Sequence, residues 1–376
     1  MEIRKKIIIA AAIIITLATV AIVCFNQFGF LTRRATKLTK TNGTTVVPTM
    51  LDKLTADSTW CGTFQLIWND MKNEVAKRDV VFTPQEIMAD NLNKETFNES
   101  MLSEEYYYKI YGLKSLELKE TIEKGIKEKF NQTSDILDKF DWSEEALNDP
   151  NDSTTNRYFF YTMLYREFEF EKEFDKLPDG TFGKYTGIKY FGIDENTKEK
   201  VGKQIDVLYY NSKDDFALIL NTKSNDEVIF VKNPQGTTFS EIYEDMLKES
   251  KEYKGSKYFE EIDEFKAPML TYNEEREYTE LQNKPVPTAM GTGTILKTIQ
   301  TIKFELNEKG GKIKSEAAMD MQNTAAIIII DKKPQPRYFY VDDTFAIFLR
   351  EIGKTMPYFA VRVEDITKYQ YKNRYR

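Results

Sequence analysis

The chain has 376 residues, of which 41% are hydrophobic, including 22 Tyr and 25 Phe, so most of it can fold around a buried core. Its formal charge of -7 excludes nucleic acid as a main partner, because no basic excess offsets the repulsion by phosphates. The absence of His excludes histidine-dependent triads and histidine-containing metal sites, and with two Cys no CxxC motif is present.

The first segment is apolar. Residues 7–25 are uncharged and follow Arg4, Lys5 and Lys6, and their length suffices to cross a hydrocarbon core. We therefore predict a single transmembrane anchor over residues 1–25, with the folded part outside the cytoplasm at the cell membrane. A cleaved signal peptide, which would make the protein secreted, is the alternative. Residues 26–50 include a stretch rich in Thr and Lys and are predicted to be a solvated linker.

Two helical segments are expected next. In residues 61–77, apolar side chains recur every three or four positions, which predicts a helix with one buried face. Residues 103–130 combine apolar positions with Glu and Lys that can pair four residues apart, and they predict a second helix. Residues 137–155 are polar and rich in turn formers, as expected of a connection.

From residue 157 onward the sequence pattern changes from helical to strand-like. Short runs of aromatic and β-branched residues are bounded by Asn, Asp, Gly or Pro, which predicts strands, and residues 238–253 interrupt them with a helical pattern. Helices first and mostly strands later indicate an α+β fold.

No motif for catalysis was found. The MGTGT stretch lacks the spacing of a phosphate-binding loop, and the acidic clusters are typical of a solvated surface. We predict no catalytic residues, no metal site, no cofactor and no enzyme activity. An envelope enzyme that uses paired carboxylates remains an alternative, but it would need a cleft that holds them.

Residues 302–321 alternate apolar and polar side chains, turn at a glycine pair and alternate again. After the turn, one face would carry the apolar or small residues Gly311, Ile313, Ser315, Ala317, Met319 and Met321. The charged residues all fall on the other face, as an inserted strand with one buried face requires. A permanent β-hairpin in another fold would show the same pattern.

Several segments resemble the serpin family. The stretch from Phe304 to Gly310 resembles the serpin strand that ends in a turn before the reactive-centre loop, and Ala317 and Ala318 resemble its small-residue hinge. Looser matches, in the family's order, cover much of residues 51–366. They lie at residues 81–84, 161–174, 215–220, 239–247, 262–268, 341–349 and 357–363.

The resemblance implies a serpin-like domain at residues 51–370, with three β-sheets, about eight helices and an exposed reactive-centre loop. It also implies a mechanism: a serine or cysteine protease cleaves the loop, which inserts into the main sheet as a strand and traps the protease. A non-inhibitory surface binding protein that retains the fold is the alternative.

Under this resemblance, the loop hinge comprises Glu308, Lys309, Gly310, Gly311, Ile313, Ser315, Ala317 and Ala318. Counting from Glu308 places the scissile bond at Thr324–Ala325, which we prefer. Counting back from the C-terminal strand places it at Lys332 or Lys333 instead.

The sequence also departs from the family's pattern. Gly311 stands where Thr or Ser is usual, and Ile313, Met319 and Met321 are larger than typical hinge residues. Overpacking by such side chains costs roughly 1–3 kcal/mol and would slow insertion. Phe170 replaces the expected breach tryptophan, which adds to the doubt about loop opening.

Overall fold

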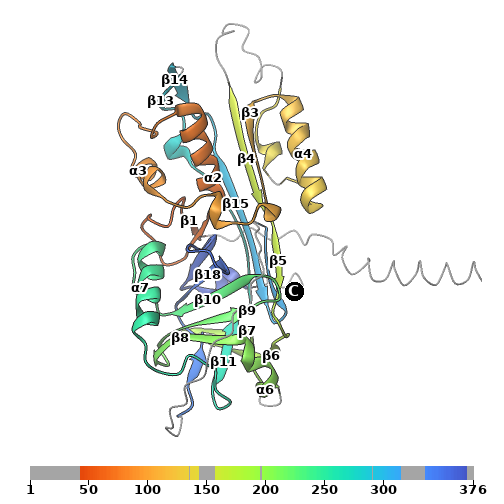
Figure 1. Cartoon of the computed structure of the whole chain (residues 1–376), viewed down its shortest axis with the longest axis vertical. Helices are drawn as coiled ribbons and strands as arrows, with labels where there is room; N and C mark the ends of the chain where they lie inside the picture. Colours follow the sequence, from red (N-terminus) through yellow and green to blue (C-terminus); the bar gives the residue numbers. More distant parts are fainter. Residues whose placement is uncertain are drawn as a thin grey trace, which may run out of the picture. The chain divides into compact units, whose positions relative to one another are not determined.

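A computed structural model of the chain describes residues 43–134, 136–143, 157–194, 197–289, 291–314 and 335–370. The chain divides into two compact units, Met1–Thr39 and Lys40–Arg376, and all described residues lie in the second. The second unit contains helices and several sheets, so the predicted α+β class is confirmed (Figure 1).

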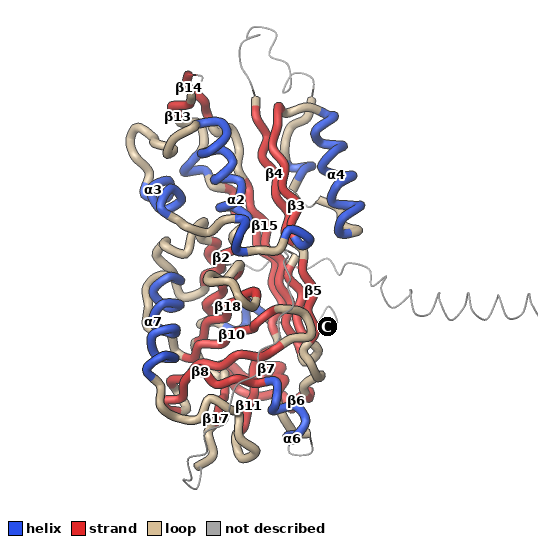
Figure 2. The backbone as a smooth tube through the Cα atoms, viewed as in Figure 1, coloured by secondary structure: helices blue, strands red, loops and turns tan. Residues whose placement is uncertain are grey.

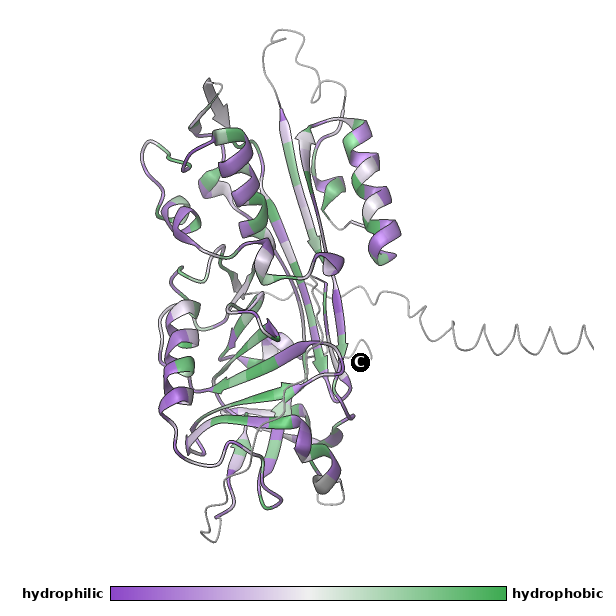
Figure 3. Cartoon of the chain, in the orientation of Figure 1, coloured by the Kyte–Doolittle hydropathy of each residue, from purple (hydrophilic) through white to green (hydrophobic). Residues whose placement is uncertain are grey.

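The first sheet has seven strands in the order β1-β2-β19-β18-β10-β9-β8. They are β1 (Thr45–Val46), β2 (Ser58–Cys61), β19 (Phe359–Val363), β18 (Phe345–Glu351), β10 (Asp226–Lys232), β9 (Asp215–Asn221) and β8 (Ile205–Ser212). Most side chains of β9, β10 and β18 are buried, as expected of strands covered on both faces. Figure 3 shows β9 and β10 dominated by hydrophobic residues.

Two further sheets have four strands each. One has the order β17-β11-β7-β6, from Tyr338–Tyr340, Glu264–Pro268, Tyr185–Gly192 and Asp175–Phe182. The other has the order β12-β15-β16-β5, from Leu270–Glu277, Ile299–Asn307, Gly310–Ile313 and Arg166–Glu169. Two strand pairs complete the set in the described residues (Figure 2): β13 (Pro285–Thr288) with β14 (Gly291–Thr294), and β3 (Tyr107–Leu113) with β4 (Tyr158–Leu164).

The described residues form five α-helices, fewer than the eight or so that we expected. They are α2 (Thr63–Asp70), α3 (Ile87–Lys94), α4 (Leu116–Phe130), α6 (Lys198–Val201) and α7 (Phe239–Glu252). A π-helical turn, Met71–Ala76, continues α2 as far as the left-handed Lys77, so the predicted helix at 61–77 is confirmed. The helix predicted at 238–253 is α7, with Thr238 as its N-cap.

The prediction of one helix over residues 103–130 was wrong in its first half. Residues Tyr107–Leu113 form strand β3, which pairs with β4 along its whole length. Aromatic side chains favour a strand when a partner strand is present, and Tyr111 stacks on Phe160 across this pair at 5.7 Å. The helix starts only after Ser115, whose Oγ accepts a hydrogen bond from the Leu118 N–H.

Helices cover parts of these sheets. Ile122 and Ile126 of α4 are buried against Phe159, Tyr161 and Met163 of β4. Phe64 and Trp68 of α2 lie in a separate apolar cluster together with residues of α3 and β13. These helices therefore lie close to β4 and to the segment that leads into β15.

The segments before β2 differ from the prediction in one respect. Val46, Val47 and Met50 are buried, although the predicted solvated linker extended to residue 50. Their apolar side chains favour the core over solvent. The predicted anchor at residues 1–25 and the linker before residue 43 lie outside the described residues. Within the described part of the chain, no helix is long and apolar enough to cross a membrane.

Candidate functional site

The candidate site begins at a β-hairpin. Strands β15 and β16 pair antiparallel, with Asn307 opposite Gly310 and Phe304 opposite Ile313. Between them, the Lys309 N–H donates a hydrogen bond to Asn307 Oδ1 at 2.9 Å, and Gly310 adopts a φ of 148°. The predicted strand and turn that precede the loop are thus present.

Strand β16 is also paired on its second edge. Gly310 lies opposite Glu169 and Ile313 opposite Arg166 in strand β5. Beyond the turn, the backbone carbonyls of Glu308 and Lys309 accept hydrogen bonds from the N–H groups of Phe174 and Phe170 at 2.8 and 2.9 Å. The start of the predicted loop hinge is therefore already a central strand of a sheet.

The glycine pair fits a crowded position. A Cβ on Gly310 would come within 2.1 Å of the Phe168 carbonyl oxygen. A Cβ on Gly311 would come within 2.4 Å of Phe168 Cζ and 2.9 Å of the Glu305 carbonyl oxygen. The Thr or Ser that the family favours at Gly311 would clash here, so close packing explains this departure.

The predicted alternation of faces holds for the described part of the hinge. Ile313 is completely buried, opposite Phe304, whereas Lys312 points to the other face and forms an ion pair with Glu167. Lys312 also lies over the Tyr165 ring, 5.0 Å from its centre. The size of Ile313 is thus accommodated in the core. Glu308 is 5% exposed and pairs with Lys176 at 3.2 Å.

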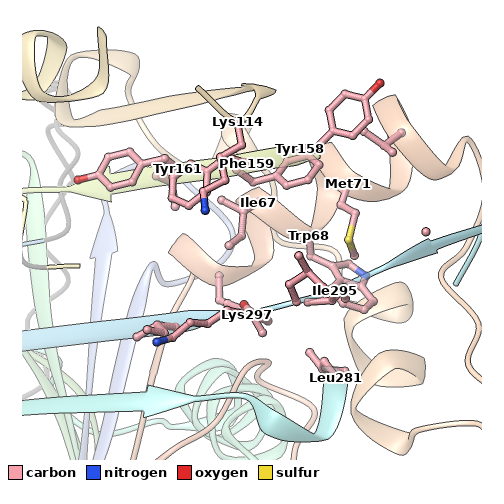
Figure 4. Close-up of a pocket in the computed structure, with 18 of the residues that line it drawn as sticks. Ile67, Trp68, Met71, Lys114, Tyr158, Phe159, Tyr161, Leu281, Ile295 and Lys297 are labelled. Carbon is pink, nitrogen blue, oxygen red and sulfur yellow. The ribbon is translucent and has the colours of Figure 1, made fainter. Parts of the chain in front are cut away.

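A cleft continues in line with β16. Beyond Ile313, the neighbouring chain on one side is β4, which precedes β5 in the sequence, and on the other side it is the first half of β15. Strand β4 is paired only with β3 among the described strands. A cavity of about 1090 Å³ lies here, lined by residues of β4, α2 and the start of β15, and also by Lys314 (Figure 4).

A buried ionic cluster adjoins the hinge. Arg166, opposite Ile313, donates a hydrogen bond to the Asp226 carboxylate, and Asp226 also accepts one from the Tyr358 hydroxyl at 2.9 Å. Burial raises the pKa of Asp226 to about 6, although Arg166 and Tyr358 oppose this rise. Glu351 lies 4.0 Å from Arg166 and accepts hydrogen bonds from Ser103.

Sequence reasoning missed this cluster and the cleft. The available signal was a charged residue at one end of each strand sequence, namely Arg166 at the start of REFE, Asp226 at the start of DEVIFVK and Glu351 at the end of FAIFLRE. Nothing in the sequence showed that these three residues meet. The remaining predicted hinge residues Ser315, Ala317 and Ala318 lie outside the described residues, as do the scissile-bond candidates Thr324, Ala325, Lys332 and Lys333.

Phe170, at the position of the expected tryptophan, lies in an aromatic cluster. Its ring centre is 4.9 Å from that of Phe174 and 5.9 Å from that of Phe191, and it is 1% exposed. The position therefore keeps a buried aromatic side chain directly beside the hinge turn.

Comparison with known proteins gives matches in structure only. No protein-family model and no curated protein matches the sequence. Similar solved structures include cleaved Serpin 42Da, with a TM-score of 0.43 and 14% identity over 69% of this chain. Serpin48 of the insect Tenebrio molitor has a TM-score of 0.36 and 16% identity over 70% of this chain. Human thyroxine-binding globulin complexed with thyroxine has a TM-score of 0.38 and 13% identity over 70% of this chain.

The titles of the first two structures name serpins, the family that the sequence resembles, and the three matches concern the fold alone. The chain covers 66% of the length of cleaved Serpin 42Da, 78% of Serpin48 and 77% of the globulin. The chain thus spans just under two thirds of the length of cleaved Serpin 42Da.

Proposed function

We propose that this protein inhibits a serine or cysteine protease by cleavage of the segment after Ile313 and insertion of that segment into the sheet. The observation that carries the proposal is the position of β16, which is paired with β15 on one edge and β5 on the other. This double pairing supports the proposal, because insertion would extend β16 along the cleft that lies on its continuation.

The register of β16 specifies where the following residues would go. If the pairing continues, Ser315 lies opposite Ile302 and Leu164, and Ala317 lies opposite Gln300 and Thr162. The inserted backbone would pair with β4 and β15 at once. Each hydrogen bond formed contributes about 1 kcal/mol, so a strand reaching Met321 would stabilise the protein substantially.

The alternation of side chains suits this path. Ser315 and Ala317 would point to the same face as Ile313 and meet Ile302 and Gln300, which are buried. Met319 and Met321 would follow at the cavity, opposite Phe160 and Tyr158 of β4, two residues that line it. The cavity has room for their larger side chains, which reduces the cost of overpacking that the sequence suggested.

The proposed partner is a protease outside the cytoplasm, and the protein itself needs no catalytic residue. We keep the single-pass membrane anchor at residues 1–25 and cleavage at Thr324–Ala325, or at Lys332 or Lys333, as parts of this proposal. They are supported by the apolar N-terminal sequence and by the spacing from Glu308.

The test is thermal unfolding of Lys40–Arg376 before and after limited proteolysis, with the cut located by mass spectrometry. This part contains all three buried clusters. A cut between Met321 and Pro334 should raise the midpoint by at least about 10 °C, because the freed strand gains partners on both edges. A cleaved form that melts at the same or a lower temperature would contradict insertion and leave the non-inhibitory binding role.

A matched pair of variants makes the test specific. Ala317→Asp places a charge on the buried face of the inserted strand and should abolish the rise in midpoint after cleavage. Lys314→Asp places a negative charge on the opposite face, next to the exposed Lys312, and should leave most of the rise intact. Equal effects of the two variants would contradict the proposed register. Insertion alone does not demonstrate inhibition. A covalent complex with a protease that survives denaturing electrophoresis would demonstrate it.

A further inference from the structure

The cavity between β4 and β15 has apolar side chains along part of its wall. Ile67 and Trp68 of α2, Met71 of the π-helical turn, and Leu281 and Ile295 contribute to its lining. In Figure 4, Trp68, Met71 and Ile295 lie close together on one side. Its volume of about 1090 Å³ is just above the range of roughly 300–1,000 Å³ typical of small-molecule sites.

Its charged residues are mostly basic. Five basic residues line the cavity, namely Lys77, Lys114, Arg157, Lys297 and Lys314, against the two acidic residues Glu74 and Asp141. Lys77 and Glu74 pair with each other at 3.0 Å, so the remaining excess is positive. This excess stands out in a chain whose formal charge is -7.

Two of these lysines interact with the backbone rather than with carboxylates. The Lys114 ammonium donates to the Asp141 carbonyl oxygen, and the Lys297 ammonium donates to the Lys139 carbonyl oxygen at 2.9 Å. Burial lowers the pKa of Lys114, and nearby Arg157 lowers it further, against an opposing effect of Asp141. Neither hydrogen bond neutralises its ammonium group, so an anion placed beside either lysine would be attracted to it.

The two ammonium groups flank the apolar interior. In the view of Figure 4, Lys114 and Lys297 lie on opposite sides of the cavity, with Ile67 between them. Lys114 lies 4.9 Å from the centre of the Trp142 ring, and Lys297 lies 5.9 Å from that of Phe140. One aromatic ring thus lies near each cation at the cavity wall, a setting suited to a ligand with an anionic head and an apolar body.

We propose that this cavity binds a long-chain carboxylate, with its head group at either Lys114 or Lys297 on the cavity wall and its acyl chain against Trp68, Met71 and Ile295. Burial of the acyl chain supplies the affinity, because each methylene group removed from water favours binding. The two lysines supply the preference for an anionic head.

One consequence depends on the function proposed above. The ligand and the inserted strand would share the cleft beside β4, so the carboxylate would slow loop insertion after cleavage. Binding itself requires neither cleavage nor insertion. A failure to bind would therefore leave the proposed inhibition untouched, and a failure to insert would leave the binding site untouched.

The test is photolabelling of the full chain with hexadecanoate that carries a diazirine near its methyl end, followed by peptide mass spectrometry. We expect adducts at Trp68, Met71 or Ile295, and at least about tenfold weaker labelling by the matching hexadecylamine, because the lysines repel its charge. Adducts confined to residues outside the cavity, or equal labelling by the amine, would overturn the proposal.

Variants locate the head group and the chain separately. Lys114→Gln combined with Lys297→Gln should lower labelling about tenfold, whereas Lys124→Gln, an exposed lysine of α4, should not change it. Ile67→Trp should fill the cavity and abolish labelling while thermal unfolding shows that the protein is folded. Unchanged labelling in both the double variant and the filled variant would refute the site.

Discussion

Gly311 lies directly against Phe168, so close that a Cβ on Gly311 would come within 2.4 Å of the Phe168 ring. This contact connects the loop hinge to strand β5, with which β16 pairs. The contact also explains why position 311 carries glycine, whereas Thr or Ser is usual there in the serpin family that the sequence resembles.

Replacing Gly311 should therefore weaken the hinge strand. We expect Gly311→Thr to destabilise the protein by roughly 1–3 kcal/mol, because Phe168 or the strand must move, and urea unfolding would measure the loss. Adding Phe168→Ala should relieve the clash, so the double variant should be more stable than the sum of the two single losses indicates. Strict additivity would show that the contact is not the cause.

Phe170 allows a second test beside the same turn. Phe170→Trp restores the residue type expected from the resemblance, but the ring is enclosed by Phe168, Phe174 and Phe191. We expect a loss of roughly 1–3 kcal/mol from overpacking, measured by urea unfolding. Tyr111→Trp, at a partly exposed ring, is the control and should change stability by less than about 0.5 kcal/mol. If Phe170→Trp leaves the free energy of unfolding unchanged, the aromatic cluster has room for the larger ring.

The pattern of residues 302–313 predicted the hairpin, its turn and its buried face correctly, because alternation and turn chemistry are local properties. The double pairing of β16 could not be predicted, since strand β5 lies more than a hundred residues earlier and pairing depends on the whole sheet. The same reason applies to β3. Its Tyr-rich sequence suits a helix or a strand, and only its partner β4 decides between them.

The charged cluster beside the hinge also depends on long-range contacts. Arg166, Asp226 and Glu351 come from three strands in two different sheets, and all three are buried in contact with one another through Arg166. Each strand sequence alone shows only a charged residue at its end, which equally suits a strand end in solvent. The cavity could not be predicted from the sequence either. It is formed between α2, β4 and β15, which lie far apart along the chain.

Asp226 predicts an unusual pH dependence. Its pKa is about 6 in the folded protein, above the ordinary value of 3.8, so the folded state binds a proton more readily than the unfolded state. The contribution of Asp226 to stability is therefore fully present below about pH 4 and is lost as the pH rises through about 6.

Thermal unfolding of the wild type and of Asp226→Asn between pH 4 and 7 measures this contribution. As the pH rises, the free energy of unfolding of the wild type should fall relative to that of Asp226→Asn. Most of this change should occur below about pH 7. Groups that face Asp226 are Arg166, Tyr358, Ser224, Glu351 and Tyr106. A constant difference across this range would show that Arg166 keeps Asp226 ionised throughout.

The ion pair between Lys312 and Glu167 should behave very differently from this buried cluster. Their side chains are 44% and 52% exposed, so water screens the attraction and each single reversal, Lys312→Glu or Glu167→Lys, should cost no more than about 1 kcal/mol. The double reversal restores opposite charges and should recover most of the loss, and added salt should shrink all three differences. Urea unfolding at low and high salt measures these values. A loss well above 1 kcal/mol that the double reversal does not recover would mean that Lys312 acts by packing on Tyr165, which its position 5.0 Å from the ring centre allows.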